Sequence, residues 1–387
     1  MQISFSNNIL SIIILIVFGL TLVIQLVYHW LVFSKVAFYK KNRRSKTDDE
    51  LEPVSIVLWT RDSYEYLMEL LPLLLKQDYP DFEIVVVNDC SEDGTEDYLK
   101  DLERIEPKVK PVLLHQHLNF FNGKKFPLSM GIKSAKNDLL IFTDVNCRPD
   151  TDKWLRNVVD CYKRNTEVVI GYCPMMFKKG LLNRIMRFDA LQQGLLYLSS
   201  ALSGHPYRGT GKNLSYRKEA FYRNKGFTSL YTTSVGDDDL FISQVATKKN
   251  TEVLIDADNA VRSIPTHNFN VWMHQKSSRY STIPQYDMRA KVSQGIFLWS
   301  QFLFYASFIA LLCLPHAFNL SIGTVYYIPI LAVFFLLRFG TQMFIYHKAS
   351  KRLGEKGLIP GLILYDLLLT ILSPLQRLMG RMKIGVE

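Results

Sequence analysis

The chain has 387 residues, a formal net charge of +10 and 48% apolar residues. A chain of this length has room for two or three domains. Its composition is too apolar for an ordinary nucleic-acid-binding protein, so we expect no nucleic-acid partner. Its five cysteines form no C-x-x-C pair and no zinc spacing, and we expect free thiols.

The N-terminal segment is apolar and is followed by a basic block. Ile9 to Phe33 carries no formal charge and exceeds the roughly 20 residues that a bilayer span needs. The start, MQISFSNN, lacks the basic residues of a cleaved signal peptide. We therefore predict a transmembrane signal-anchor over 1–33 and a basic juxtamembrane linker over 34–53. By the positive-inside rule the linker lies in the cytoplasm, because it is rich in basic residues: Lys35, Lys40, Lys41, Arg43, Arg44 and Lys46.

Segment 54–290 alternates strand-like and helix-like patterns. Helices are expected between the first two strands, at 94–102 and at 127–134. This alternation is typical of an α/β domain with a mostly parallel sheet. Ligands of such sheets bind beyond the carboxyl ends of the strands, so the residues there are the first candidates for a site. Short β-branched runs predict the strands themselves at 54–58, 83–87, 138–143 and 167–171.

Acidic and amide side chains follow three of these strands. A single Asp in this position often only caps the next helix. Three acidic strand ends at one edge repel one another unless a positive group joins them, and a divalent cation carrying a diphosphate would do so. We therefore expect these strand ends to converge on such a ligand. Their sequences are Trp59-Thr60-Arg61-Asp62, Asn88-Asp89-Cys90-Ser91-Glu92-Asp93 and Thr143-Asp144-Val145-Asn146.

The same segments resemble a known family. VSIVLWTRD, LLPLLLKQDYPDFEIVVVNDCSEDGT and GKKFPLSMGIKSAKNDLLIFTDVNCRPD resemble the nucleotide-sugar half of the inverting family 2 glycosyltransferases. RGTGKNLSYRKEAF, SVGDDDLF and WMHQKSSRYS resemble the acceptor half of that family. The resemblance implies a Rossmann-like, mostly parallel GT-A catalytic domain over 54–290, flanked by transmembrane helices. Its nucleotide-sugar half would span 54–150 and its acceptor half 151–290.

The resemblance also implies a donor pocket for a nucleotide sugar, which family frequency predicts to be a UDP-sugar. Asp89 would bond the base or the ribose, and Lys124 would approach the nucleotide. Asp93 would lie close by, or only cap the helix after Gly94. The full predicted set is Thr60, Arg61, Asp62, Asp89, Asp93, Lys124 and Asp144.

The predicted metal site departs from the family pattern. The usual motif is Asp-x-Asp, whose last acid ligates Mg²⁺ or Mn²⁺, whereas this chain has Asp144 and Asn146. An amide carbonyl is a legitimate ligand for a hard cation but carries no charge. We expect Asp144 and Asn146 to form a weakened site, with His267 or His274 as further candidate ligands. The opposing interpretation is that the chain binds nucleotide sugar poorly or not at all.

Three consecutive acids, Asp237, Asp238 and Asp239, are the candidates for the catalytic base. The family pattern Glu-Asp-x-Asp-Leu places the base at Asp237, with Asp238 as the alternative and Gly236 where Glu is common. The base would take the proton of the acceptor hydroxyl in a single displacement. The simpler interpretation is a solvated acidic turn that caps a helix beginning near Leu240.

The resemblance assigns four residues to the acceptor and diphosphate site. Many processive members carry Gln-x-x-Arg-Trp, but here the arginine after Gln275 arrives one position late, and Tyr280 replaces the tryptophan. This departure favours the addition of one or a few sugars over polymer synthesis. The glycine allows close backbone approach. The four residues are Gly211, Lys212, Gln275 and Arg279.

The C-terminal region, 291–387, is again apolar. Spans are predicted at 294–318 and 321–346, with Arg338 near enough to an end to snorkel. The segment 358–379 either crosses the membrane or lies re-entrant or interfacial, because Asp366 and Pro374 interrupt it and a crossing would place its basic tail outside.

A further helix, 180–202, is expected between the two halves of the domain, either packed in the core or lying at the membrane interface. Together these features predict an integral protein of a bacterial inner membrane with a cytoplasmic catalytic domain. It would move a sugar to a lipid or lipid-linked glycan. The alternatives are a processive polysaccharide synthase and a non-catalytic, nucleotide-binding membrane scaffold.

Overall fold

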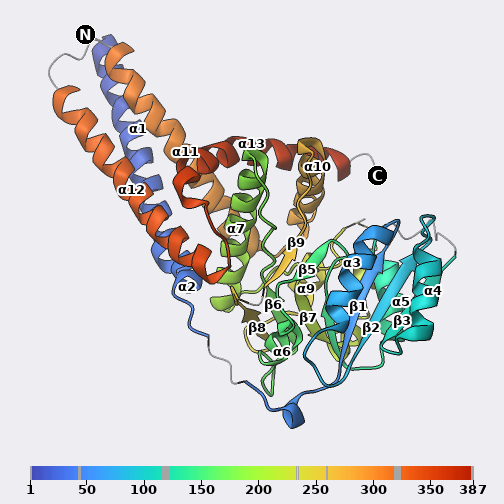
Figure 1. Ribbon diagram of the computed structural model, residues 1–387. Helices are drawn as coiled ribbons and strands as arrows, with labels where there is room; N and C mark the ends of the chain where they lie inside the picture. Colours follow the sequence, from blue (N-terminus) through green and yellow to red (C-terminus); the bar gives the residue numbers. More distant parts are fainter. Residues whose placement is uncertain are drawn as a thin grey trace.

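A computed structural model of the protein describes residues 2–41, 45–115, 123–231, 233, 235–258, 260–317 and 324–384. Arg43 and Arg44 of the predicted basic linker lie outside these ranges, as does the junction at 318–323 between two predicted spans. An α/β domain packs against a bundle of long helices (Figure 1). The five cysteines, all of them described, are free thiols as expected.

The α/β domain is built, within the described residues, on a seven-stranded sheet in the order β3-β2-β1-β4-β7-β6-β8. The first four of these strands are parallel to one another, β7 is antiparallel to β4 and β6, and β8 is parallel to β6. The predicted α/β, mostly parallel sheet is thus confirmed. Strands β5 (Cys147–Pro149) and β9 (Val261–Ser263) form a separate antiparallel pair. The sheet strands are β1 (Val54–Thr60), β2 (Phe82–Asp89), β3 (Val109–Leu114), β4 (Leu139–Phe142), β6 (Val168–Gly171), β7 (Leu214–Arg217) and β8 (Thr251–Leu254).

Both faces of the sheet are buried, which explains why its strands are continuous apolar runs. Ile56 of β1 packs into one apolar cluster and its neighbour Val57 into another. The second cluster continues without a break from the sheet into the helical bundle, where it includes Phe18 and Phe304. The domain and the bundle therefore share one core. The helices of the domain are α3 (Tyr64–Leu75), α4 (Thr95–Ile105), α5 (Lys125–Ser134), α6 (Trp154–Val159), α7 (Leu181–Leu202), α8 (Lys218–Arg223), α9 (Asp239–Val245) and α10 (Phe269–Tyr280), with short 3₁₀ turns η2 (Asp48–Glu50), η3 (Thr228–Leu230) and η4 (Ile283–Gln285).

Helix α5 lies unusually close to the sheet. A Cβ atom at Gly131 would come within 2.6 Å of Val87 and 2.9 Å of Val57, so only glycine permits this approach. The close packing fixes the N-terminus of α5, and with it Lys124 and Lys125, relative to β1 and β2.

The bundle consists of α1 (Gln2–Val27), the π-helix η1 (Tyr28–Phe33), α2 (Ser34–Ala37), α11 (Met288–Ala317), α12 (Thr324–Arg352), η5 (Ile359–Gly361) and α13 (Leu362–Ile384). Among the described residues, four helical segments are long and apolar enough to cross a membrane: 12–37, 288–313, 328–352 and 359–379. Helices α1, α11 and α12 run alongside one another, whereas α13 lies across their direction and contacts α10 (Figure 1).

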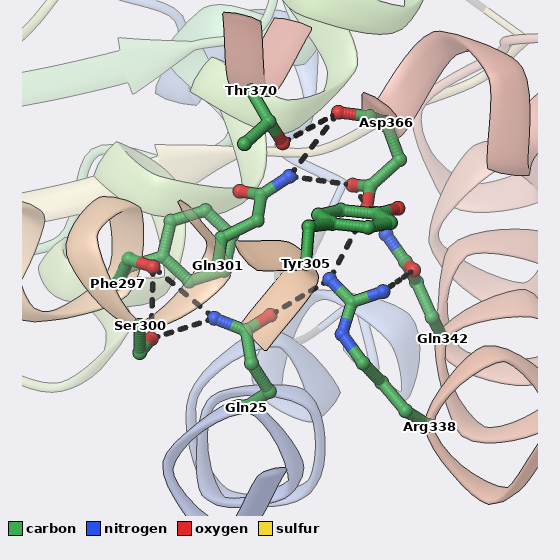
Figure 2. A network of polar contacts seen from close by, with 9 residues as sticks. All are labelled: Gln25, Phe297, Ser300, Gln301, Tyr305, Arg338, Gln342, Asp366 and Thr370. Atoms are coloured by element: carbon green, nitrogen blue, oxygen red, sulfur yellow. Dashed lines mark hydrogen bonds and ion pairs between the residues drawn. The ribbon is translucent and has the colours of Figure 1, made fainter. Parts of the chain in front are cut away.

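Arg338 does not snorkel, contrary to the expectation from its position in the sequence. It is fully buried in the bundle, and its guanidinium lies 3.1 Å from the carboxylate of Asp366 on α13. Figure 2 shows the polar side chains that surround this pair. A buried charge without a partner is strongly destabilising. The need to pair Arg338 therefore explains why Asp366 interrupts the apolar segment 358–379.

Helix α7 passes between the domain and the bundle (Figure 1). It contacts β8, α2 and α13, and most of its side chains are buried. Two of these buried side chains are charged: Arg187 pairs with Glu355 at 2.6 Å, and Asp189 pairs with Lys276 at 2.7 Å. This environment is that of a core-packed helix.

Candidate active site

The ends of β1 and β2 carry buried polar groups without partners. The strand register places Thr60 beside Asn88, and both side chains are fully buried. Neither the Thr60 hydroxyl nor either amide atom of Asn88 makes a hydrogen bond within the described part of the chain. Such groups are uncommon in folded proteins and offer donors and acceptors to a ligand. Thr60 was predicted as a site residue. Asn88 was noted at its strand end but was not assigned to the donor pocket, because an amide inside a strand carries no distinguishing pattern.

Asp89, at the end of β2, accepts hydrogen bonds from two side chains at the end of β1. Arg61 donates from Nη2 to the Asp89 carboxylate at 2.6 Å and from Nε to its backbone carbonyl at 3.1 Å. The Trp59 indole donates to the same carboxylate at 3.1 Å. The predicted residues Arg61 and Asp89 thus meet, with Trp59 as an unpredicted third member.

Asp62 and Asp93 organise the loops next to this group. Asp62 has a left-handed backbone with φ of 45°, and its carboxylate accepts from the N–H of Glu92 at 2.8 Å. Asp93 accepts from the N–H groups of Tyr64 and Thr95, the first residues of α3 and α4. These contacts are those of loop-fixing and helix-capping residues, and the donor-binding roles of both remain predictions.

Lys124 and Asp144 form an ion pair at the centre of the site. Their charged atoms are 2.9 Å apart, and the Lys124 ammonium also lies 4.7 Å from the centre of the Trp59 ring. Burial alone would raise the pKa of Asp144, but the positive charges of Lys124, Lys212 and Arg279 lower it. Three cations from separate parts of the sequence therefore converge on one carboxylate.

A cavity at this point, the strand-end cavity, is lined by Lys124, Asp144, Gly211, Asp237 and Asp238. It brings donor, acceptor and acidic-triplet candidates into one space. Burial raises the pKa of Asp237 to about 7, and the neighbouring negative charge of Asp238 is the second cause of this increase. A carboxyl group with this pKa can exchange a proton near neutral pH, which a general base requires.

The three acids of the triplet have different environments. Asp238 accepts from the backbone N–H of Gly211 at 2.9 Å and from that of Asp239 at 2.7 Å, where it caps α9. Asp239 is buried and accepts from the hydroxyls of Tyr286 at 2.5 Å and Thr282 at 2.6 Å. The simpler interpretation of a helix cap therefore describes Asp238. It does not describe Asp237, which shares the cavity with Asp144.

Lys125 contacts the segment that precedes the acidic triplet and was missed by sequence reasoning. It is fully buried, and its ammonium donates to the backbone carbonyls of Thr233 and Val235, the latter at 2.6 Å. These contacts connect the N-terminus of α5 to the segment just before Gly236. In the Lys124-Lys125 pair nothing in the sequence tells which lysine is buried.

A second cavity, the α10 cavity, is lined by Lys212, Gln275 and Arg279, the remaining predicted acceptor-site residues. Arg208 and the buried pair Lys276–Asp189 also line it. Lys212 and Arg279 of this cavity lie close enough to Asp144, which lines the strand-end cavity, to lower the pKa of that carboxyl group.

The chain is similar to known proteins in its sequence and in its fold. Residues 55–224 match the model of the family described as Glycosyl transferase family 2. The protein carries a family 2 glycosyltransferase domain. Its fold is similar to that of a mannosyltransferase from Pyrobaculum calidifontis, solved in complex with GDP-Man and Mn²⁺, at a TM-score of 0.59 and 18% identity over 90% of this chain and 100% of that one.

Two curated bacterial relatives match part of this chain. The putative teichuronic acid biosynthesis glycosyltransferase TuaG of Bacillus subtilis (strain 168) is 25% identical over 107 residues, which are 28% of this chain and 39% of TuaG. The poly-beta-1,6-N-acetyl-D-glucosamine synthase of Staphylococcus epidermidis (strain ATCC 35984) is 26% identical over 202 residues, 50% of this chain and 48% of the synthase. The chain thus spans less than half the length of either relative.

The metal-binding candidates of the glycosyltransferase domain are few. Within the described residues no three His, Cys, Asp or Glu side chains could together hold a metal ion. Asp144 lines the strand-end cavity, and Mg²⁺ is often held by one or two carboxylates plus substrate phosphates, so this acid fits a cation completed by a diphosphate. The Asn146 side-chain oxygen lies 3.7 Å from the Cys147 sulfur, and its metal role remains a prediction. His267 instead contacts Lys178 at 2.7 Å.

Proposed function

We propose that this protein is an inverting glycosyltransferase. It moves a sugar from a nucleotide-diphosphate sugar, by preference a UDP-sugar, to a lipid or lipid-linked glycan at the cytoplasmic face of a bacterial inner membrane. One observation carries the proposal. Asp237, with a pKa of about 7, shares a cavity with a carboxylate whose surroundings are dominated by Lys124, Lys212 and Arg279. A base and a cation-rich place for a diphosphate are what such a transfer requires.

In the proposed reaction the acceptor hydroxyl attacks the anomeric carbon while Asp237 takes the hydroxyl proton. The bond from that carbon to the diphosphate breaks, and its electron pair leaves with the nucleoside diphosphate. Lys124, Lys212 and Arg279 stabilise the developing negative charge. A divalent cation, held by Asp144 and by prediction Asn146, would supply further positive charge to the diphosphate oxygens when bound.

The other two acids of the triplet position the base. Asp238 fixes Gly211 and the start of α9, and its charge raises the pKa of Asp237. Asp239 connects α9 to Thr282 and Tyr286, just before α11. Through Asp239 the position of the base depends on the packing of the helical bundle.

The lipid acceptor is proposed from the surroundings of the site. Helix α10, which carries Gln275 and Arg279, contacts α13, one of the helices that are apolar enough to lie in a membrane. An acceptor that emerges from the bilayer at this contact would reach the α10 cavity directly. Addition of one or a few sugars remains the favoured outcome, because Arg279 and Tyr280 depart from the pattern of processive enzymes.

The test uses detergent-purified protein, Mn²⁺ and a panel of nucleotide sugars, with release of nucleoside diphosphate as the measurement. We expect one donor to be turned over. Asp237→Asn should bind that donor and lose roughly 10²–10⁴-fold in kcat, whereas the exposed-site control Asp258→Asn should match the wild type. Full turnover by Asp237→Asn would move the base to Asp238. Nucleotide binding without turnover of any donor would favour the scaffold interpretation.

A further inference from the structure

A groove lies between two helices of the bundle, α11 and α13, and is here called the bundle groove. Its volume is about 300 Å³, at the lower end of the roughly 300–1,000 Å³ of small-molecule pockets. Its walls are largely apolar, with a few small polar groups and a single basic side chain, Arg377. The apolar residues that line it are Leu298, Trp299, Phe302, Pro374 and Leu378.

The bundle groove opens on the outer surface of the helices. Trp299 is 64% exposed and Leu378 is 62% exposed, although both are large apolar side chains. Both belong to segments that are long and apolar enough to cross a membrane, so this surface is suited to contact with lipid rather than water. An exposed tryptophan is also typical of the level at which a membrane meets water.

Pro374 gives the groove part of its shape. A proline inside a helix cannot donate a backbone hydrogen bond to the residue four positions earlier, here Thr370. Thr370, Ser373 and Pro374 all line the groove, so small side chains and a weakened turn of α13 form one wall. A long, narrow apolar ligand fits such a wall better than a bulky one.

Arg377 lies where the groove meets the active-site helix. Its guanidinium is 5.3 Å from the centre of the Tyr280 ring, the last residue of α10. The Lys276 ammonium lies 5.1 Å from the same ring and lines the α10 cavity. The neighbouring Gln376 donates to the sulfur of Met273 on α10 at 3.2 Å. A basic group thus stands at the inner border of the groove, one aromatic ring away from the α10 cavity.

We propose that the bundle groove binds a lipid phosphate, with its hydrocarbon chain along the apolar walls and its phosphate at Arg377. The role of the bundle groove as an acceptor site rests on the proposed function and specifies the class of acceptor. Charge complementarity selects the ligand, because a guanidinium binds phosphate oxygens through paired hydrogen bonds, and the largely apolar walls suit a hydrocarbon chain. The hydroxyl or glycan end of such a lipid extends past Tyr280 toward Arg279.

The experiment measures binding of a radiolabelled long-chain alkyl phosphate to the full-length protein in nanodiscs. Arg377→Gln removes the cation, and Ser373→Leu fills the groove from a buried position. We expect each to weaken binding at least tenfold. The matched controls are Arg289→Gln and Ala306→Leu, both exposed on α11 and outside the groove lining, and they should bind like the wild type. Unlabelled alkyl phosphate should displace the probe, whereas inorganic phosphate and the long-chain alcohol at equal concentration should not.

If both Arg377→Gln and Ser373→Leu bind the probe like the wild type, the bundle groove is not the lipid-binding site. If inorganic phosphate alone displaces the probe, the site binds phosphate and not a lipid phosphate. Donor turnover is measured in parallel. If turnover depends on Asp237 but lipid binding is unchanged in Arg377→Gln, the groove is not the lipid site and the proposed function stands. Arg377-dependent lipid binding without turnover of any donor refutes the proposed function and keeps the groove.

Discussion

Two aspartates of this protein pair with a basic side chain at nearly the same distance, yet their surroundings differ. Lys124 and Asp144 lie 2.9 Å apart in the strand-end cavity, with 34% and 28% of their side chains exposed. Arg338 and Asp366 lie 3.1 Å apart in the bundle, and both are fully buried. The Asp366 carboxylate also accepts hydrogen bonds from three further side chains, and Arg338 donates to a fourth (Figure 2). These four are Gln301, Tyr305, Gln342 and Gln25.

The contrast separates a structural ion pair from one that we propose to be functional. In the bundle the partners come from α1, α11, α12 and α13, so the pair joins all the long helices and leaves little capacity for a ligand. In the cavity the Asp144 side chain has Lys124 as its one hydrogen-bond partner among the described residues. Its remaining capacity, and that of the surrounding cations, is available to a substrate.

The largest expected effect is on stability and follows removal of one partner in the bundle. Asp366→Leu leaves Arg338 buried without its counter-charge, and we expect the free energy of unfolding to fall by about 3–5 kcal/mol. Denaturation in mixed micelles measures this free energy of unfolding. The double variant Arg338→Met/Asp366→Leu should recover most of the loss, since no charge is then buried. Equal stability of Asp366→Leu and wild type would contradict a structural role.

The matching change in the cavity should affect activity instead. Asp144→Asn keeps the shape of the side chain at a partly exposed position, so we expect the free energy of unfolding to change by less than about 1 kcal/mol. The value of kcat should fall roughly 10²–10³-fold, because the cation and the diphosphate lose their charged partner. Nucleoside diphosphate release and thermal unfolding of the same sample measure both. A large loss of stability with unchanged specific activity would remove the contrast between the two pairs.

The pH dependence of the reaction should report Asp237. Burial raises the pKa of this acid to about 7, and only its deprotonated form can accept a proton. We therefore expect kcat/KM to rise about tenfold per pH unit up to roughly pH 7 and to level off above it. Initial rates between pH 5 and 9 measure the profile.

Asp238→Asn provides the control for this profile. The substitution removes the negative charge that helps to raise the pKa of Asp237. The acidic limb should therefore move to lower pH, while the amide oxygen can still accept from Gly211. If the acidic side of the pH profile is unchanged in Asp238→Asn, a group other than Asp237 controls it.

The smallest expected effect concerns the metal. Asn146→Asp restores a second acid next to Asp144, and a further carboxylate should raise the affinity for Mn²⁺ in the presence of a nucleoside diphosphate roughly tenfold. Calorimetric titration of both proteins measures the affinity. Unchanged affinity would remove Asn146 from the metal site.

Much of the fold and part of the site follow from local sequence patterns. Short β-branched runs located β1, β2, β4 and β6, and the rule that ligands bind beyond the carboxyl ends of parallel strands directed attention to Arg61, Asp89 and Asp144. Apolar composition located the long helices. These features depend on neighbours in the chain, because strand alternation, helical periodicity and span length are properties of single segments.

Tertiary structure alone decided which charged residues act together. Lys125 contacts Val235 across 110 positions, Arg338 finds Asp366 on another helix, and Asp237 differs from Asp239 only in what packs against it. Burial and distance set the pKa of an acid and the partner of a buried charge. Both depend on packing between segments that are remote in sequence, which no local pattern encodes.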